Sequence, residues 1–423
     1  MRKVLFAIAM FISVVSYALH VESVGNAVLL ENNGDTLFLF ESNPELHSNV
    51  GAIDWYRLPD TIVPFSTKME HFYPEPGEGY GIKVNGEWEY FWVLDYSLLR
   101  PQVIELVAVP TCENTQLTLQ GTIPSIQYTR VDKTEQVYAR QCHVIYTNAM
   151  WVEEQWEDSL VVEQINYTTN MTVGATPLAS TFTIVDPLAQ ILGVSMDSLE
   201  SAPIEPIAIK SHPLAIVTTR PNDKSNEVSR PIDPTTLIMR SAPLEVEFKA
   251  NALNAEYYEW ELFNGSESIL RRSEAQHKYT FEQPSSYRAT LKMSNSHGCE
   301  CEAEDFEISV PVSMLKVPNV FTPNGDGAND EFRVVYSSIR EFHCWIYNRW
   351  GHLVYQWSDP AKGWDGTING KPAAEGAYYY VIRALGTDAK SDYISKPSYS
   401  KKLKKGEMPV GVYQLSGDIN LLR

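Results

Sequence analysis

Short runs of apolar and aromatic residues recur along the chain, and Gly, Pro, Asn or Asp separates one run from the next. Alternation of apolar and polar residues with a period of two is typical of half-buried β-strands. Trp55 is expected in the core of the first domain, and Asn85-Gly86 is expected to close a hairpin because both residues tolerate positive φ. An immunoglobulin-like β-sandwich over residues 19–110 is predicted by seven runs: 27–30, 37–40, 53–56, 62–65, 80–84, 90–96 and 103–109.

The pattern is less regular over residues 111–201, where we expect a second β-rich domain. Residues 150–159 fit either a short helix or an acidic strand at a sheet edge, and both interpretations stay open. Prolines recur through residues 202–213, which predicts a stiff, extended linker. The runs that suit strands of the second domain are 117–119, 137–145, 160–167 and 182–185.

Clear strand patterns return after the linker and predict a third sandwich over residues 214–312. Over residues 313–423, short aromatic runs and the turn dipeptides Asp365-Gly366 and Asn369-Gly370 predict a smaller antiparallel sandwich. At its end, residues 413–415 and 419–422 are expected to form a hairpin around Ser416-Gly417-Asp418. The strand runs of the third sandwich are 244–249, 257–263, 278–281, 287–293 and 306–310.

The last predicted sandwich carries several motifs in a fixed order. VPNVFTPNGDGANDEF spans residues 317–332, and IYNRWGHLVYQW, GWDGTINGKPAAEGAYYYVIRAL and YQLSGDINLLR follow. This series resembles the gliding motility-associated C-terminal domain, the type B sorting domain of the type IX secretion system of Bacteroidota. The segment FEQPSSYRATLKMSNSHGCECE before it resembles a PKD-like domain. The resemblance implies an all-β chain of tandem immunoglobulin-like and PKD-like β-sandwiches that ends in a small sorting domain at residues 313–423.

The same resemblance implies an export route and partners. Proteins with this domain cross the outer membrane through the type IX translocon, and an outer-membrane β-barrel partner accompanies them. On this chain the sorting signal implied by the family falls on Gly417, Ile419, Leu421, Leu422 and Arg423.

The N-terminal residues 1–18 have the pattern of a secretory signal peptide. Arg2 and Lys3 precede an apolar run at residues 4–15, and Ser16-Tyr17-Ala18 offers a small-x-small cleavage site. No later run reaches the ~20 apolar residues that a membrane span requires. We therefore expect an exported protein, and the resemblance implies that it passes through the periplasm to the cell surface or the extracellular space.

Charge narrows the classes of partner. With 34 basic and 53 acidic residues, the net charge of -19 disfavours nucleic acid and anionic membrane surfaces. Catalytic motifs such as H-E-x-x-H, G-x-S-x-G and the P-loop do not occur, so we expect no enzyme and no resident cofactor. A solvated loop is expected for the basic cluster Lys396, Lys401, Lys402, Lys404 and Lys405.

Asn324, Asp326 and Asp330 are the best candidates for ligand chemistry. They place oxygen donors at intervals in a glycine-containing loop, as a hard cation such as calcium requires. In the competing interpretation, the same side chains cap backbone amides in a turn. Both interpretations remain open.

Five cysteines are an odd number for an oxidising compartment, so at least one is unpaired within the chain. We predict a disulfide between Cys112 and Cys142, and a second candidate bridge within Cys299-Glu300-Cys301. Cys344 lies in a predicted strand and is expected to be a buried free thiol.

The expected function is non-enzymatic. An exported β-sandwich protein with a binding, adhesion or structural role toward an unknown extracellular ligand fits these observations best. An envelope-associated accessory component of the motility or secretion apparatus is the alternative. An enzyme with its site in residues 111–201 is a third interpretation.

Overall fold

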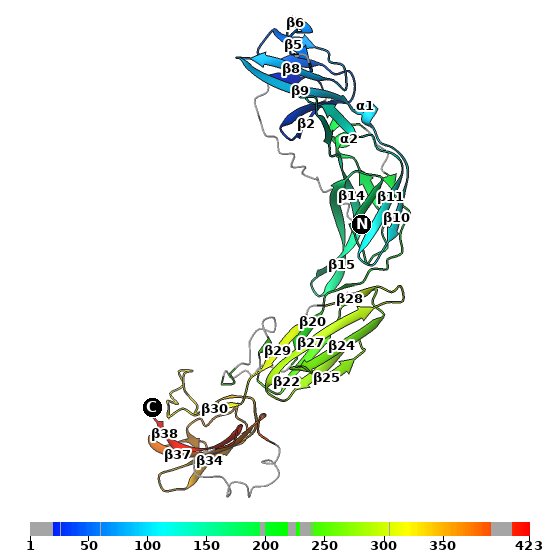
Figure 1. Cartoon of the computed structure of the whole chain (residues 1–423). Coiled ribbons are helices and arrows are strands. Elements are labelled where there is room, and N and C mark those ends of the chain that lie inside the picture. Colours follow the sequence, from blue (N-terminus) through cyan, green and yellow to red (C-terminus); the bar gives the residue numbers. More distant parts are fainter. Residues whose placement is uncertain are drawn as a thin grey trace. The chain divides into compact units, whose positions relative to one another are not determined.

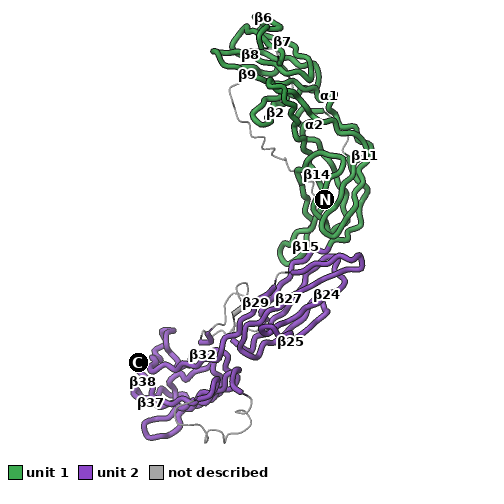
Figure 2. The backbone as a smooth tube through the Cα atoms, in the orientation of Figure 1, with its two compact units in different colours: residues 1–208 green, residues 209–423 purple. Residues whose placement is uncertain are grey.

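The computed structural model describes residues 20–423 except 26, 60, 195–198, 219–225, 229–237, 240, 304 and 391–407. The predicted signal peptide and the lysine cluster lie outside the described residues. The chain divides into two compact units, Met1–Ala208 and Ile209–Arg423, at a point inside the predicted linker (Figures 1 and 2). Apart from two short helices, every element of the described part is a β-strand, which confirms the all-β prediction.

A six-stranded sheet forms most of the first domain. Trp55 is fully buried beneath it, as predicted, and its ring packs against Phe72 and Phe91. Asn85 and Gly86, with φ of 52° and 91°, close the hairpin of β8 and β9 as expected. The spatial order is β2 (Ala27–Asn32), β3 (Asp35–Phe40), β9 (Glu87–Asp95), β8 (Gly79–Val84), β5 (Ile53–Arg57) and β6 (Ser66–Met69). The smaller sheet opposite holds β1 (Val21–Ser23), β4 (Leu46–Ser48) and β7 (His71–Phe72).

The second domain is a sandwich of two sheets. Its first strand is β10 (Gln102–Pro110), which pairs with β11, so this domain begins at about residue 102 and not at residue 111. Residues 150–159 form the tip of the β14–β15 hairpin, where Glu153 and Glu154 have positive φ, so the strand interpretation holds. The other strands are β11 (Asn114–Thr122), β16 (Asn170–Gly174), β15 (Gln155–Asn166), β14 (Gln141–Val152), β17 (Thr183–Val185) and β18 (Leu199–Glu200).

A further core cluster joins these two domains. Elements that follow the first domain in sequence pack against β2, β3 and β9: α1 (Tyr96–Leu99), β12 (Ile126–Thr129), β13 (Glu135–Tyr138) and α2 (Pro187–Leu192). Arg140 and Asp186 form a buried ion pair there, and the Tyr96 hydroxyl donates to Asp186 Oδ2 at 2.7 Å. Removing one partner of such a pair leaves an uncompensated buried charge. The junction is therefore specified by a buried polar network.

The unit Ile209–Arg423 begins with the third sandwich. Trp260 is fully buried in its core. The end of the predicted linker belongs to this sandwich, because β19 (Lys210–Ser211) pairs with β23 (Ala252–Leu253). One sheet holds β20 (Leu214–Val217), β22 (Leu244–Lys249) and β26 (Gln276–Phe281). The other holds β21 (Ile238–Met239), β29 (Phe306–Val310), β27 (Ser285–Ser294), β24 (Tyr257–Asn264), β25 (Glu267–Arg272) and β28 (Glu300–Glu302).

The C-terminal domain is a smaller sandwich. Its core contains the rings of Phe321, Phe332 and Trp364, and Asn369-Gly370 closes the β35–β36 hairpin as predicted. The five-stranded sheet has the order β31 (Val320–Phe321), β38 (Val412–Leu421), β37 (Gly376–Gly386), β33 (Ile339–Tyr347) and β34 (Leu353–Trp357). The remaining strand pairs are β30 (Met314–Lys316) with β32 (Val335–Ser337), and β35 (Thr367–Ile368) with β36 (Lys371–Pro372).

Hydrogen bonds fasten this domain to the chain before it. The backbone N–H of Ser338 donates to Ser241 Oγ at 2.6 Å, and Ser338 Oγ donates to the Pro311 carbonyl at 2.8 Å. Residues 226–228 add a short parallel bridge to β32, in which Tyr336 exchanges two backbone hydrogen bonds with them. The upstream chain therefore completes one edge of the C-terminal domain.

The cysteines correct two predictions. Cys142 is a free and fully buried thiol, so the predicted Cys112–Cys142 bridge is wrong, although Cys112 itself is disulfide-bonded. The alternation of β14 directs Cys142 into the core, whereas Cys112 lies in the turn after β10. Cys301 is also free, so the local bridge within Cys299-Glu300-Cys301 is absent. Cys344 is a buried free thiol, as predicted.

Candidate functional site in the C-terminal domain

The strand β38 is unbroken and pairs with β37 over its whole length. The predicted hairpin around Ser416-Gly417-Asp418 is therefore wrong. Exposure alternates through this stretch, so Ser416 and Asp418 are outward-facing strand residues and no turn is present. Gly417 is required by a close approach, because a Cβ there would lie 2.8 Å from Tyr380 Oη.

The residues implied in the sorting signal divide into buried and exposed positions. Ile419 and Leu421 are fully buried in the core of the C-terminal domain, whereas Leu422 is 49% exposed. Burying an Ile or Leu side chain stabilises a fold by about 1.5–3 kcal/mol relative to leaving it exposed. The end of β38 therefore stabilises the domain and also presents at least one residue to solvent.

Arg423 is exposed but tethered to the domain. Its Nη1 donates to the carbonyl of Ala373 at 2.6 Å, and its Nη2 donates to the carbonyl of Gly366 at 3.2 Å. These two bonds join the end of the chain to the segment that carries the β35–β36 hairpin. Arg423 thus has a structural role that its position in the sequence did not reveal.

The predicted cation loop uses its carboxylates on its own backbone. The two carboxylate oxygens of Asp330 accept the N–H groups of Gly325 and Gly327 at 2.6 and 2.8 Å. Asp326 Oδ1 accepts the N–H of Ala328 at 2.8 Å. This geometry is that of the capped turn, the competing interpretation of the motif.

The third predicted ligand joins the same network, because Asn324 Nδ2 donates to Asp326 Oδ2 at 2.9 Å. Hydrogen bonds from the Ala328 amide and from Asn324 lower the pKa of Asp326, since they favour the ionised carboxylate. The described residues contain no group of three His, Cys, Asp or Glu side chains arranged to hold a metal ion. Calcium binding at Asn324, Asp326 and Asp330 stays a prediction.

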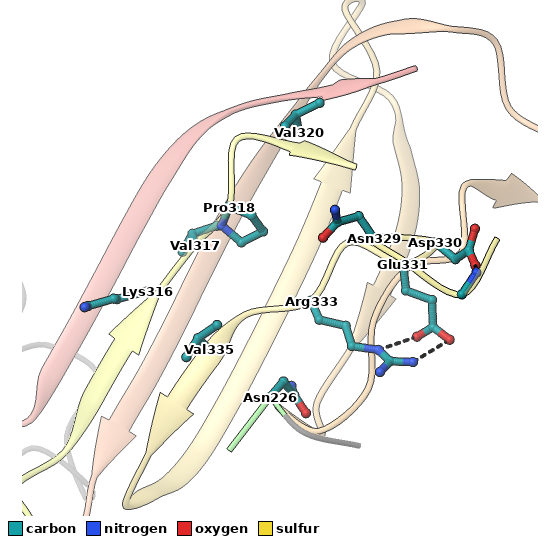
Figure 3. Close-up of a pocket in the computed structure, with 11 residues that line it drawn as sticks. Asn226, Lys316, Val317, Pro318, Val320, Asn329, Asp330, Glu331, Arg333 and Val335 are labelled. Carbon is teal, nitrogen blue, oxygen red and sulfur yellow. Dashed lines mark hydrogen bonds and ion pairs between the residues drawn. The ribbon is translucent and has the colours of Figure 1, made fainter. Parts of the chain in front are cut away.

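A groove of about 700 Å³ opens beside this loop (Figure 3). The strands β30 and β32 separate here because Pro318 has no N–H to donate and Phe332 pairs with Trp364 instead. The lining of the groove is partly apolar and partly charged. Its apolar residues are Val317, Pro318, Val320 and Val335, and its charged residues include Asp330, Glu331 and Arg333.

Three polar side chains that line the groove, Arg333, Glu331 and Asn226, make hydrogen bonds or ion pairs there. Arg333 holds Glu331 through Nε and Nη2 at 2.8 and 2.7 Å, as Figure 3 shows. Asn226 is only 9% exposed, and its Nδ2 donates to the carbonyls of Val334 and Pro360, both at 2.9 Å. Its Oδ1 accepts no hydrogen bond within the described part. Sequence reasoning missed Asn226 because it lies 108 residues from its partner Val334.

A second candidate surface lies on the first domain, around the expected strand at residues 62–65, which forms no strand. Phe65 is held by an edge contact with Phe72, whose ring centroid is 5.1 Å away. Contiguous exposed apolar patches on soluble domains commonly mark interaction sites. The exposed apolar side chains between residues 62 and 73, named here the exposed cluster, are Ile62 at 87%, Val63 at 64%, Phe65 at 51%, Met69 at 46% and Tyr73 at 69% exposure.

Comparisons with known proteins match two regions of the chain. Residues 315–396 match the CHU_C type IX secretion signal domain, and residues 107–201 match a fibronectin type III domain. The match at residues 107–201 covers most of the second β-rich domain. The PKD-like assignment of residues 214–312 stays a prediction.

Two solved structures match the chain at low sequence identity. The FN1-FN3 domains of chicken CNTN1 are 11% identical, with a TM-score of 0.23, and the match covers 76% of this chain and 98% of that chain. The fibronectin(III)-like modules of Clostridium thermocellum CbhA are 13% identical, with a TM-score of 0.17 and coverage of 49% and 93%. Comparison with curated proteins gives no match.

The secretion signal domain establishes the broad class of this protein. Such a C-terminal domain marks a protein that interacts with the type IX machinery and is exported to the cell surface or the extracellular space. None of the helices in the described ranges is long and apolar enough to cross a membrane.

Proposed function

We propose that this chain is a non-enzymatic surface or secreted protein whose first domain binds an extracellular ligand and whose strand β38 acts as the export signal. The observation that carries the export part of the proposal is the secretion signal domain matched at residues 315–396. The role of β38 rests on the resemblance of residues 417–423 to the family's sorting signal. The exposed apolar cluster around Phe65 supports the binding role.

Removing residues 419–423 tests the export signal. The truncated chain is expected in the periplasm and absent from the cell surface. It loses the buried side chains of Ile419 and Leu421 and leaves the neighbouring edge of β37 partly unpaired. Cell fractionation and labelling of surface proteins measure the distribution. A truncated chain on the surface at the wild-type level would contradict the proposal.

A point variant separates recognition from folding. Leu422 is half exposed, so Leu422→Ser is expected to change stability by less than about 0.5 kcal/mol. Reduced export of this folded variant would show that the translocon reads the exposed end of β38. Normal export of Leu422→Ser together with failed export of the truncated chain would assign the signal to the buried part of the strand.

The ligand role is tested with a matched pair of surface variants. Val63→Ser with Phe65→Ser replaces two apolar side chains of the exposed cluster by polar ones, and Ile104→Ser removes an even more exposed apolar side chain, 86% exposed, from β10. Cells that display each chain are compared for attachment to polystyrene and to agarose. The double variant is expected to reduce attachment and the Ile104 control to preserve it. Equal attachment of all three chains would remove the binding role from this cluster.

Whether the exported chain stays bound to the outer membrane distinguishes an envelope-associated accessory component from a released binding protein. We propose that an outer-membrane β-barrel partner accompanies the chain during export, as the resemblance implies. Stable co-purification with outer-membrane proteins after export would favour the envelope-associated accessory component over a released binding protein.

A further inference from the structure

Two histidines lie side by side on the outer surface of the smaller sheet of the first domain. His47 on β4 and His71 on β7 are directly opposite residues of an antiparallel pair. The next residues of the same pair, Leu46 and Phe72, are buried in the core, so the alternation of the strands directs both histidines outward. Their ring centroids are 4.8 Å apart. The buried neighbours therefore hold two imidazoles close together at the surface.

Each ring is also held by the carboxylate that precedes the other strand. Nδ1 of His71 donates to Glu45 Oε1 at 3.1 Å, and Nε2 of His47 donates to Glu70 Oε1 at 3.3 Å. Because a carboxylate only accepts hydrogen bonds, the protons of the neutral rings lie on these two nitrogens. The lone pairs are then on Nε2 of His71 and Nδ1 of His47. Within the described residues, neither of these nitrogens has a hydrogen-bond partner.

This arrangement is typical of histidines that bind a metal ion. Such a histidine binds through one ring nitrogen and donates from the other to a carboxylate or a carbonyl, which fixes the tautomer and makes the binding nitrogen more basic. Imidazole suits Zn²⁺, Ni²⁺ and Cu²⁺, whereas Ca²⁺ and Mg²⁺ prefer oxygen ligands. Two Zn–N bonds of about 2.0–2.1 Å at a tetrahedral angle set the ring centroids about 5 Å apart, close to the separation of His47 and His71.

We propose that His47 and His71 together bind one divalent transition metal ion, such as Zn²⁺, between β4 and β7. Nδ1 of His47 and Nε2 of His71 are the ligands, and Glu45 and Glu70 orient the rings through the opposite nitrogens. No third His, Cys, Asp or Glu side chain within the described ranges is placed to join them. The other coordination positions are open to water or to a donor atom of another molecule, because the side chains of His47 and His71 are 30% and 53% exposed.

The alternative is a set of ordinary surface hydrogen bonds. Such a bond needs no second histidine, as His20 shows, because its Nδ1 pairs with Glu89 Oε1 at 2.5 Å and no other imidazole of the described part contacts it. His20 lies in the same domain and is therefore a matched control. The metal site is independent of the ligand role proposed for the exposed cluster and of export by the type IX machinery.

Competition between the purified full chain and a chromophoric zinc indicator, in an excess of Ca²⁺, tests the proposal. The wild-type chain is expected to remove one equivalent of Zn²⁺ from the indicator. His47→Gln and His71→Gln each remove a ligand and should abolish this binding. Glu45→Gln removes no ligand but should weaken binding by about 10- to 100-fold. His20→Gln should bind as the wild type does.

Two further measurements do not depend on the indicator. X-ray absorption at the zinc edge of the wild-type complex should show two imidazole ligands. Added Zn²⁺ should raise the melting temperature of the wild type and leave that of His71→Gln unchanged, since only a bound ion stabilises the folded state.

Three results would overturn the proposal. The first is a wild-type chain that takes up no Zn²⁺. The second is equal uptake by the wild type, His47→Gln and His71→Gln, because the ion would then bind elsewhere. The third is a zinc spectrum with no imidazole ligand or with more than two.

Discussion

Gly417→Ala tests the close packing of β38 on the sheet beside it. A Cβ at this position would lie 2.8 Å from Tyr380 Oη and 3.0 Å from two carbons of its ring. The ring cannot retreat freely, because its centroid lies 6.0 Å from that of the buried Phe332. Overpacking of this kind costs about 1–3 kcal/mol. The lower entropy of the unfolded Ala chain offsets about 0.4–1 kcal/mol, so a mid-range overpacking cost of about 2 kcal/mol leaves a net loss of about 1–2 kcal/mol.

Hydrogen–deuterium exchange of the full chain measures this loss locally. A decrease of about 1–2 kcal/mol corresponds to amides of β37 and β38 that exchange about 5- to 30-fold faster. Tyr380→Phe removes the nearest atom, so the double variant with Gly417→Ala should lose less than the sum of the two single variants.

Ser416→Ala is the matched control. Ser416 lies next to Gly417 on the exposed face, and its replacement is expected to stay within about 0.5 kcal/mol of the wild type. Equal exchange rates for Gly417→Ala and Ser416→Ala would refute the close approach and the strand register on which it depends.

Three further predictions concern Arg423, the buried thiols and the loop that contains Asp330. Arg423→Ala is expected to lower the melting temperature, because two hydrogen bonds from a charged donor, one of them to Ala373, are lost at about 1 kcal/mol or more; an unchanged melt would assign the side chain no structural role. Burial raises the pKa of the Cys142 thiol from 9.0 to about 12 and also raises that of Cys344. The folded state then holds protons that the unfolded state releases, so stability is present below pH 9.0 and is lost as pH rises above it. Thermal melts of the wild type and of Cys142→Ala across this range measure the difference, and parallel curves would contradict it. Chelator should lower the melting temperature of the wild type but not of Asp330→Ala if the loop binds calcium, and equal melts would leave only the capped turn.

The sequence alone determined the class of fold and most of the strands. Alternation with a period of two is a local property of a half-buried strand, and the dipeptides Asn85-Gly86 and Asn369-Gly370 close hairpins through their own tolerance of positive φ. The positions of Trp55 and Cys344 within strand patterns also predicted that both side chains are buried, and both are buried. The motifs that begin at residues 317–332 resemble the secretion signal domain from sequence alone, and residues 315–396 match it.

Only the tertiary structure decided which strands pair and which side chains meet. Gly and Asp at positions 417 and 418 have the composition of a turn, but pairing with β37 and the ring of Tyr380 make Gly417 a strand residue. Cys142 had a plausible disulfide partner by spacing, but the orientation of β14 buries it as a free thiol. Asn226 carried no signal because its partners lie more than a hundred residues away. Local patterns specify how a strand is exposed, whereas its neighbours are set by packing between segments distant in sequence.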